Sequence, residues 1–228
     1  MFRPVFQSLV ILAGLALTAC AGSDFSRESA LSHDGLERVS GHDFAEVYLR
    51  PEADLGHYQH LSLSACEVSF RKNWLRDQQR DSRALASRVR QEDADRIRQH
   101  MASACDEHFR AALEREPAYD LVEEAPNGED VLLLRPSIVN LDIHAPDVQG
   151  AVRSRSYTTS AGEMTLNLEL VDALTGEVQA RVVDRRRGVE QSRLQWTNSV
   201  TNRAEFRRIL RRWADLLRDS LDRVRAAQ

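Results

Sequence analysis

Two alternating segments joined by a short turn constrain the fold of this chain more than any other feature. Over 164–170 apolar residues alternate with polar ones, and the same alternation returns over 178–182. The residues from Asp172 to Gly176 suit a turn, because an aspartate side chain can bond the backbone two residues on and glycine accepts a positive φ. The pattern predicts an antiparallel hairpin with one apolar face, which another layer must cover.

Two amphipathic helices are candidates for that layer. Over 91–115 apolar or small residues recur at intervals of three and four, and acidic residues in the first turn suit the positive end of the helix dipole. A second helix begins at Asn202, where Glu205 completes a capping box. Its apolar stripe consists of Phe206, Ile209, Leu210, Trp213, Leu216, Leu217, Leu221 and Val224. We expect both helices to pack on the sheet.

Further strands are predicted over 58–70 and 131–144. In 58–70 the alternation slips by one residue at Cys66, which indicates either a β-bulge or a strand buried on both faces. In 131–144 the odd-numbered apolar residues are expected to face one way. The opposite face is assigned to Leu132, Leu134 and Ile138.

These elements predict an α+β two-layer sandwich. The sheet is expected to be mostly antiparallel with about four strands, in the order strand-helix-strand-strand-strand-helix, with two helices on one face. The segment 71–90 is expected to be a loop or an irregular helix, and 145–162 a polar loop that contains Tyr157. Because no glycine-rich loop follows a strand, a doubly wound nucleotide-binding fold is not expected.

The first nineteen residues indicate export rather than a folded element. Arg3 precedes a mostly apolar run, Val5 to Ala19. As a helix this run would span only about 22 Å, less than the ~30 Å hydrocarbon core of a bilayer. It therefore has the character of a signal-peptide core.

The run ends in Leu17-Thr18-Ala19-Cys20, which resembles the bacterial lipobox. The resemblance implies cleavage before Cys20, a diacylglyceryl group on its sulfur and usually an N-acyl chain, and two or three chains make anchoring permanent. The alternative is an ordinary secretory signal that contains a cysteine. Inner-membrane lipoproteins typically carry Asp where this chain has Ala21, so the expected location is the outer membrane, facing the periplasm.

The chain is expected to divide into a signal peptide over 1–19, lipidated Cys20 with a flexible tether over 20–45, and one periplasmic α+β domain over 46–228. The tether is rich in polar residues and has no sustained apolar period. Across the chain, 35 acidic and 31 basic residues are interspersed, for a formal net charge of −4. This balance disfavours a nucleic-acid partner bound through bulk phosphate attraction.

Several segments together resemble the uncharacterised bacterial lipoproteins grouped as domain of unknown function 3313. The resemblance covers roughly 47–224 and rests on these residues: Pro51-Glu52-Ala53-Asp54-Leu55 with Tyr58, Val171-Asp172-Ala173-Leu174-Thr175-Gly176-Glu177, Val182-Val183-Asp184-Arg185-Arg186, and Trp213-Ala214. It implies a lipoprotein of the cell envelope. It supplies no catalytic residues.

Cys66 and Cys105 are the cysteines that remain beside Cys20, and both occupy apolar phases of their predicted elements. In an oxidising periplasm a disulfide between them is reasonable, and on the chain-entropy model it would stabilise the fold by roughly 4 kcal/mol at most. The alternative is two buried, reduced cysteines that act as small apolar residues. A redox-active pair is not expected, since no Cys-x-x-Cys motif is present.

Asp142 and His144 share one face of a predicted strand, and with Tyr157 they could form an unrecognised hydrolase-like site. The simpler interpretation is a solvated face where the strand leaves the core. His57 and His60 flank a strand start without an identifiable third metal ligand. No catalytic, cofactor-binding or metal-binding residue is assigned, and no cofactor is expected.

His108 lies among core positions and is most simply a buried histidine with a hydrogen-bond partner. Arginines cluster on the last helix and after the hairpin: Arg207, Arg208, Arg211, Arg212, Arg218, Arg185, Arg186 and Arg187. On the helix, interleaved aspartates favour a solvated face over an anion-binding site.

Two hypotheses follow for function. The favoured one is a non-enzymatic module, anchored to the outer membrane, that binds an envelope protein or polymer through a sheet edge or the 145–162 loop. The other is an enzyme with a site near Asp142 and His144.

Overall fold

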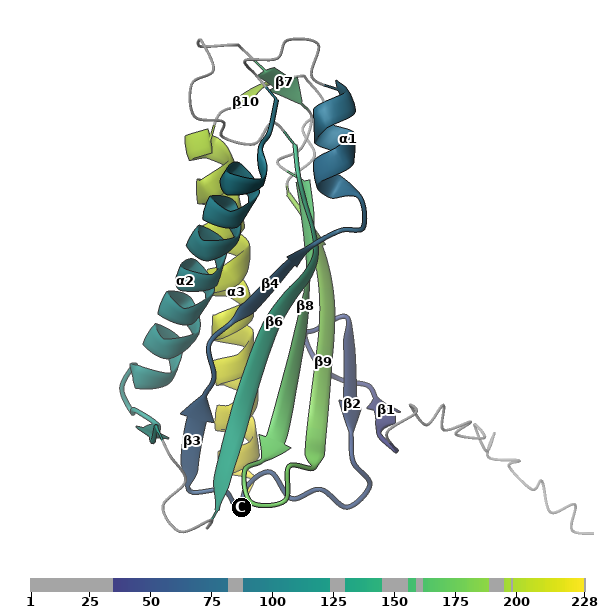
Figure 1. The fold of residues 1–228 in the computed structure, drawn as a ribbon. Helices are drawn as coiled ribbons and strands as arrows, with labels where there is room; N and C mark the ends of the chain where they lie inside the picture. Colours follow the sequence, from purple (N-terminus) through teal and green to yellow (C-terminus); the bar gives the residue numbers. More distant parts are fainter. Residues whose placement is uncertain are drawn as a thin grey trace, which may run out of the picture.

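A computed structural model of the chain describes residues 35–81, 88–123, 130–144, 156–158, 162–188, 195–197 and 199–227 (Figure 1). The centre of the fold is an eight-stranded mixed sheet in the order β1-β2-β9-β8-β6-β3-β5, in which β4 also pairs with β6. Among the described residues, no helix combines the length and the apolar character that a membrane span requires.

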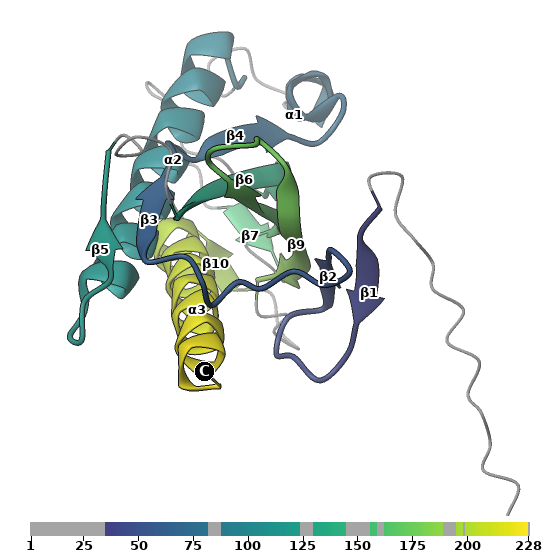
Figure 2. The ribbon, with the colours of Figure 1, turned by 90° about the horizontal axis from the view of Figure 1, so that it is seen from below.

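The strands of this sheet are β1 (Glu37–Val39), β2 (Glu46–Leu49), β3 (His60–Leu63), β4 (Glu67–Phe70), β5 (Asp120–Leu121), β6 (Val131–Ile143), β8 (Gly162–Asp172) and β9 (Val178–Arg187). A separate pair consists of β7 (Ser156–Thr158) and β10 (Gln195–Thr197). The helices are α1 (Trp74–Asp81), α2 (Gln91–Glu114) and α3 (Ser199–Ala226). Figure 2 shows the strands curving around α3.

The prediction of a mostly antiparallel sheet of about four strands with two helices was wrong. The sheet has eight strands and the described chain has three helices. Strands β3 and β4 both run parallel to β6. The chain leaves β4, passes through α2 and returns to β6 in the same direction, and such a crossover makes the flanking strands parallel.

Short elements account for the other differences. Strand β1 lies inside the range interpreted as a tether, 20–45, and Leu36 beside it is fully buried. Helix α1 is a regular helix within 71–90, where a loop or an irregular helix was expected. Elements this short carry too little periodicity to be recognised in sequence.

The predicted hairpin is confirmed as β8 and β9. The Asp172 Oδ1 atom accepts hydrogen bonds from the backbone N–H groups of Leu174, at 3.0 Å, and Thr175, at 2.7 Å. Gly176 has a φ of 72°, the left-handed conformation that the turn requires. The long helices are also close to their predicted ranges.

Two irregularities explain the strand patterns. Leu63 pairs with Leu134, but Glu67 pairs with Ser137, so the strand from β3 to β4 contains one extra residue, as a bulge requires. In β6 the register shifts after Val139, at Asn140, whose φ is 53°. This shift turns Leu141 and Ile143 to the face already occupied by Leu134 and Ile138, so the predicted division into odd and even faces was wrong.

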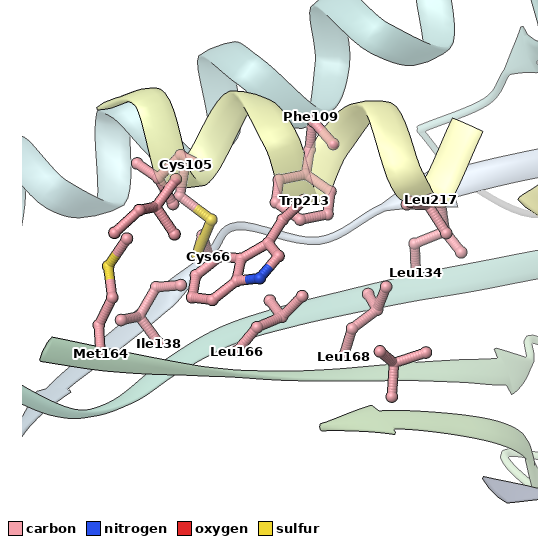
Figure 3. Packing of buried hydrophobic residues seen from close by; sticks show 14 of the residues in the cluster. Cys66, Cys105, Phe109, Leu134, Ile138, Met164, Leu166, Leu168, Trp213 and Leu217 are labelled. Atoms are coloured by element: carbon pink, nitrogen blue, oxygen red, sulfur yellow. A yellow bond between two sulfur atoms is a disulfide. The ribbon is translucent and has the colours of Figure 1, made fainter. Parts of the chain in front are cut away.

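The core lies between the sheet and the two long helices. Trp213 of α3 is fully buried and points toward the sheet, with Ile138 and Leu166 beneath it (Figure 3). Phe109 of α2 is also fully buried. Helix α2 is tied by a disulfide from Cys105 to Cys66, the residue directly before β4.

Arg218 of α3 closes the C-terminal end of α2. This almost fully buried guanidinium donates to the backbone carbonyls of Ala112, Arg115 and Pro117, at 3.2, 2.7 and 2.7 Å. Asp222 accepts two hydrogen bonds from its Nε atom, both at 2.8 Å. Carbonyls at a helix end lack partners within the helix, so a buried cation there satisfies them and fixes α3 against α2.

Candidate functional site

One face of the central sheet carries polar and charged side chains. From Gly162 to Leu170 of β8 the residues alternate between buried and half-exposed, and the buried side chains from Met164 to Leu170 belong to the core under the helices. The half-exposed ones are Glu163, Thr165, Asn167 and Glu169. We call these four residues, with the residues paired opposite them on β6 and β9, the open sheet face.

Cross-strand ion pairs order one end of the open sheet face. Arg181 of β9 donates to Glu169 Oε1 through Nη2 at 2.9 Å and Nε at 3.3 Å. Arg135 of β6 lies on the other side of Glu169, with its Nη1 atom 4.0 Å from Oε2. Neighbouring Ser137 donates from its Oγ atom to the Asn167 carbonyl at 2.9 Å. The three central strands therefore present these groups in fixed positions.

A second ion cluster lies at the other end of this face. Glu163 accepts hydrogen bonds from Arg185, at 2.6 and 2.8 Å, and from Arg187, at 3.2 and 3.4 Å. Burial acts to raise the pKa of Glu163, but the hydrogen bonds from the two arginines outweigh it and lower the pKa. Both arginine side chains remain more than half exposed, at 63% and 60%, so they are accessible to a ligand.

Asp142 borders this cluster and is held by Arg71. The Arg71 Nε atom donates to Asp142 Oδ2, and its Nη1 atom donates to Asp77 Oδ2 of α1, each at 2.7 Å. The hydrogen bond from Arg71 lowers the pKa of Asp77 despite some opposing desolvation. Asp142 Oδ1 is buried without a hydrogen-bond partner among the described residues. Asp142 therefore joins the sheet to α1.

The other residues considered for chemistry lie on several different elements. His144 is exposed at the end of β6. Tyr157 lies on β7, but its side chain is outside the described residues. The His57 Nδ1 atom is hydrogen-bonded to the Asp54 carbonyl, whereas His60 pairs with Asp120 Oδ2 at 2.7 Å. Within the described ranges, no group of three His, Cys, Asp or Glu residues is placed to hold a metal ion.

His108 is half-buried on α2, and its Nε2 atom is buried without a hydrogen-bond partner in the described part of the chain. Burial lowers the pKa of His108; Glu107 and Asp215 oppose this effect, while Arg211 and Arg207 add to it. The hydrogen-bond partner predicted for His108 is therefore not found at Nε2 among the described residues.

Several arginines on α3 are paired with acidic residues. Arg207 lies 3.6 Å from Glu107, and Arg208 lies 3.2 Å from Glu205. Cys20 and most of the 145–162 loop lie outside the described residues.

The segments that carry the family resemblance bond to one another. Tyr58 donates its hydroxyl to Asp172 Oδ2 at 2.9 Å, which fixes the hairpin to the segment before β3. Trp213 donates its Nε1–H to Asp184 Oδ2 at 2.8 Å, and Arg186 donates to the same oxygen at 2.8 Å. These residues hold the fold together.

A comparison with family models matches residues 26–217 to the family described as Protein of unknown function (DUF3313). The chain belongs to this family. No curated protein matches the chain. The family description assigns no function.

Solved structures show distant likeness. The PelC dodecamer from Paraburkholderia phytofirmans is 12% identical, covers 79% of this chain and 96% of its own, and has a TM-score of 0.37. A neuraminyllactose-binding hemagglutinin homolog from Helicobacter pylori, so described in its title, is 9% identical, with coverages of 83% and 97% and a TM-score of 0.42. A DUF330 protein from Xanthomonas campestris is 13% identical, with coverages of 75% and 86% and a TM-score of 0.40. Likeness at this level says nothing of a ligand or an assembly for this chain.

The two ion clusters of the open sheet face were not predicted from the sequence. A signal was present, because the turn over 172–176 sets the register of the hairpin. That register places Glu169 opposite Arg181 and Glu163 opposite Arg187. Opposite charges directly across two strands stabilise the pairing.

Proposed function

We propose that this family member is a lipid-anchored, non-enzymatic binding protein of the bacterial cell envelope. In this proposal the signal peptide is removed, Cys20 carries the acyl chains, and the domain faces the periplasm from the outer membrane. The lipobox over 17–20 supports the anchor. The disulfide between Cys66 and Cys105 suits an oxidising compartment.

The open sheet face carries the binding part of the proposal. It is a rigid surface on which Arg185 and Arg187 are accessible while Glu163 holds them in place. Groups held in position before binding lose little conformational entropy when a partner arrives. Charged groups at fixed spacing also give a partner specificity and register. The partner class is an envelope protein or an envelope polymer.

An enzymatic function receives no comparable support from the geometry. Arg71 engages Asp142, which orients that carboxylate toward α1 and Asp77. A general base needs access to a substrate proton. We therefore propose a binding function rather than an enzymatic one.

In-cell crosslinking tests this proposal. A photoreactive residue replaces Thr165, at the centre of the open sheet face, and in a matched strain it replaces Arg110, which is exposed on the outer side of α2. We expect one specific adduct from position 165 and none from position 110. Reversing both charges, with Arg185→Glu and Arg187→Glu, should abolish the adduct while the protein still accumulates. Identical adducts from 165 and 110, or an adduct indifferent to the charge reversal, would refute a binding role for this face.

A further inference from the structure

The turn between β8 and β9 exposes an apolar side chain. Leu174 is 71% exposed and is the one exposed large hydrophobic residue in the described part of the chain. It belongs to the turn that joins β8 to β9, and this turn lies at the lower end of the molecule in Figure 1. A single exposed leucine is ordinary on a protein surface, so its meaning depends on how it is held and where it lies.

Leu174 is held on a locked turn. Besides the two backbone bonds to Asp172 Oδ1, the Thr175 hydroxyl donates to the same oxygen at 3.0 Å. The Ala173 N–H donates to the Val131 carbonyl at 3.0 Å, which ties the tip to the neighbouring strand. Tyr58, almost fully buried, holds the second oxygen of Asp172. A turn fixed in this way loses little conformational entropy when it moves from water into a binding surface.

The hairpin tip lies at the end of the domain where the chain enters from its N-terminal side. Glu37 of β1 pairs with Leu49, and Leu49 pairs with Ala180, two residues after β9 begins. The described chain therefore starts close to the end of the sheet where β8 turns into β9. The opposite end is farther away by the length of β6, about 43 Å for thirteen residues.

The length of chain before Gly35 limits which end can approach the anchoring membrane. The fourteen residues over 21–34 span at most about 50 Å. Contact by the hairpin tip requires little of this length, whereas contact by the opposite end would use most of it. Tethering also raises the effective concentration of a nearby group to the millimolar range, so a weak contact is populated.

We propose that the hairpin tip is the membrane-contacting end of the domain, with Leu174 entering the interfacial region of the zwitterionic lipid surface to which Cys20 is anchored. This inference rests on the anchor in the proposed function. Burial of one leucine favours the contacting state about tenfold or more. With a tether in place, a contact of this strength orients the domain.

The charge around the tip sets the lipid preference. Glu52 is exposed on the turn after Arg50, and Glu177 lies 3.2 Å from Arg50, whose Nε atom is occupied by the Val178 carbonyl. Asp130 precedes the strand to which the tip is tied. Carboxylates here are repelled by anionic headgroups. The contact should therefore weaken as anionic lipid is added, the reverse of a basic membrane-binding surface.

Site-specific labelling tests the orientation. With Cys20 acylated and Cys66 bonded to Cys105, a substituted cysteine is the free thiol to be labelled. The mature protein is reconstituted in phosphatidylcholine vesicles that contain a brominated lipid quencher, with a fluorophore on Leu174→Cys or, as control, on Arg187→Cys at the opposite end. We expect quenching at 174 at least fivefold greater than at 187, and a decrease at 174 when phosphatidylglycerol is added.

A second variant tests the contribution of the Leu174 side chain with the fluorophore at another position. With the fluorophore on Glu52→Cys, the further change Leu174→Ser should reduce quenching severalfold, because the exposed residue can be replaced without affecting the core. Equal quenching at positions 174 and 187, or no effect of Leu174→Ser, would overturn the inference. It would also be overturned if position 174 became shielded only when envelope proteins were added. Mass measurement of the reconstituted protein first establishes the acylation of Cys20. Its absence would refute the anchor itself, so the two failures are distinguishable.

Discussion

Removal of the Asp184 carboxylate should destabilise the domain by about 1–3 kcal/mol, the range for leaving a buried hydrogen-bond donor without an acceptor. Asp184 is 1% exposed, and Trp213, which donates to it, is fully buried. In Asp184→Ala the indole N–H would have no acceptor at that position. Arg186 would also lose its partner, but its side chain is 32% exposed and water can replace the bond.

A double-mutant cycle isolates the hydrogen bond itself. Asp184→Ala, Trp213→Phe and the double variant are unfolded in urea and followed by far-ultraviolet circular dichroism, which does not depend on the tryptophan. A bond to a charged group contributes about 1.5–3 kcal/mol, so a coupling energy of that size is expected. The matched control, Asp219→Ala on the exposed side of α3, should change the free energy of unfolding by less than about 0.5 kcal/mol. A coupling energy below about 0.5 kcal/mol would show that this bond does not hold α3 on the sheet.

Two further predictions concern stability. Cys66 and Cys105 are 39 residues apart, and reduction of their disulfide should lower the free energy of unfolding by up to about 4 kcal/mol in urea titrations. Reductant should have no effect on the Cys66→Ala/Cys105→Ala variant. An unchanged urea midpoint for the reduced wild-type protein would contradict a stabilising role of the disulfide. The pKa of His108 is lowered mainly by burial, so the unfolded chain takes up this proton first as the pH falls below the ordinary value of 6.5. Stability should therefore fall from pH 7 to pH 5 more steeply in the wild-type protein than in His108→Gln, and parallel pH profiles would refute the assignment.

The features predictable from sequence were those with long, regular periods. The hairpin was recognisable because its alternation spans both strands and the segment 172–176 has turn chemistry. Helices α2 and α3 extend over many turns, so their apolar stripes are clear. The parallel pairing of β3 and β4 with β6 was missed, because the strand-helix-strand order permits a crossover connection without fixing which strands are neighbours.

The remaining features depend on single residues or on tertiary contacts. Asn140 reverses the facing pattern of β6 through one left-handed residue, and asparagine within a strand is only a weak signal for such a bulge. The bridge from Arg71 to Asp142 joins residues 71 positions apart, and no local pattern predicts it. The charge ladder from Glu163 to Arg187 could have been predicted from the hairpin register, because the turn fixes that register.

The modification state of Cys20 tests the central claim most directly. Intact mass analysis of the chain purified from membranes should show an N-terminus at Cys20 that carries a thioether-linked diacylglyceryl group. Cys20→Ser should leave the membrane fraction or remain as the uncleaved precursor. A mature chain with an unmodified Cys20, or a Cys20→Ser protein processed and retained in membranes like the wild type, would contradict the account.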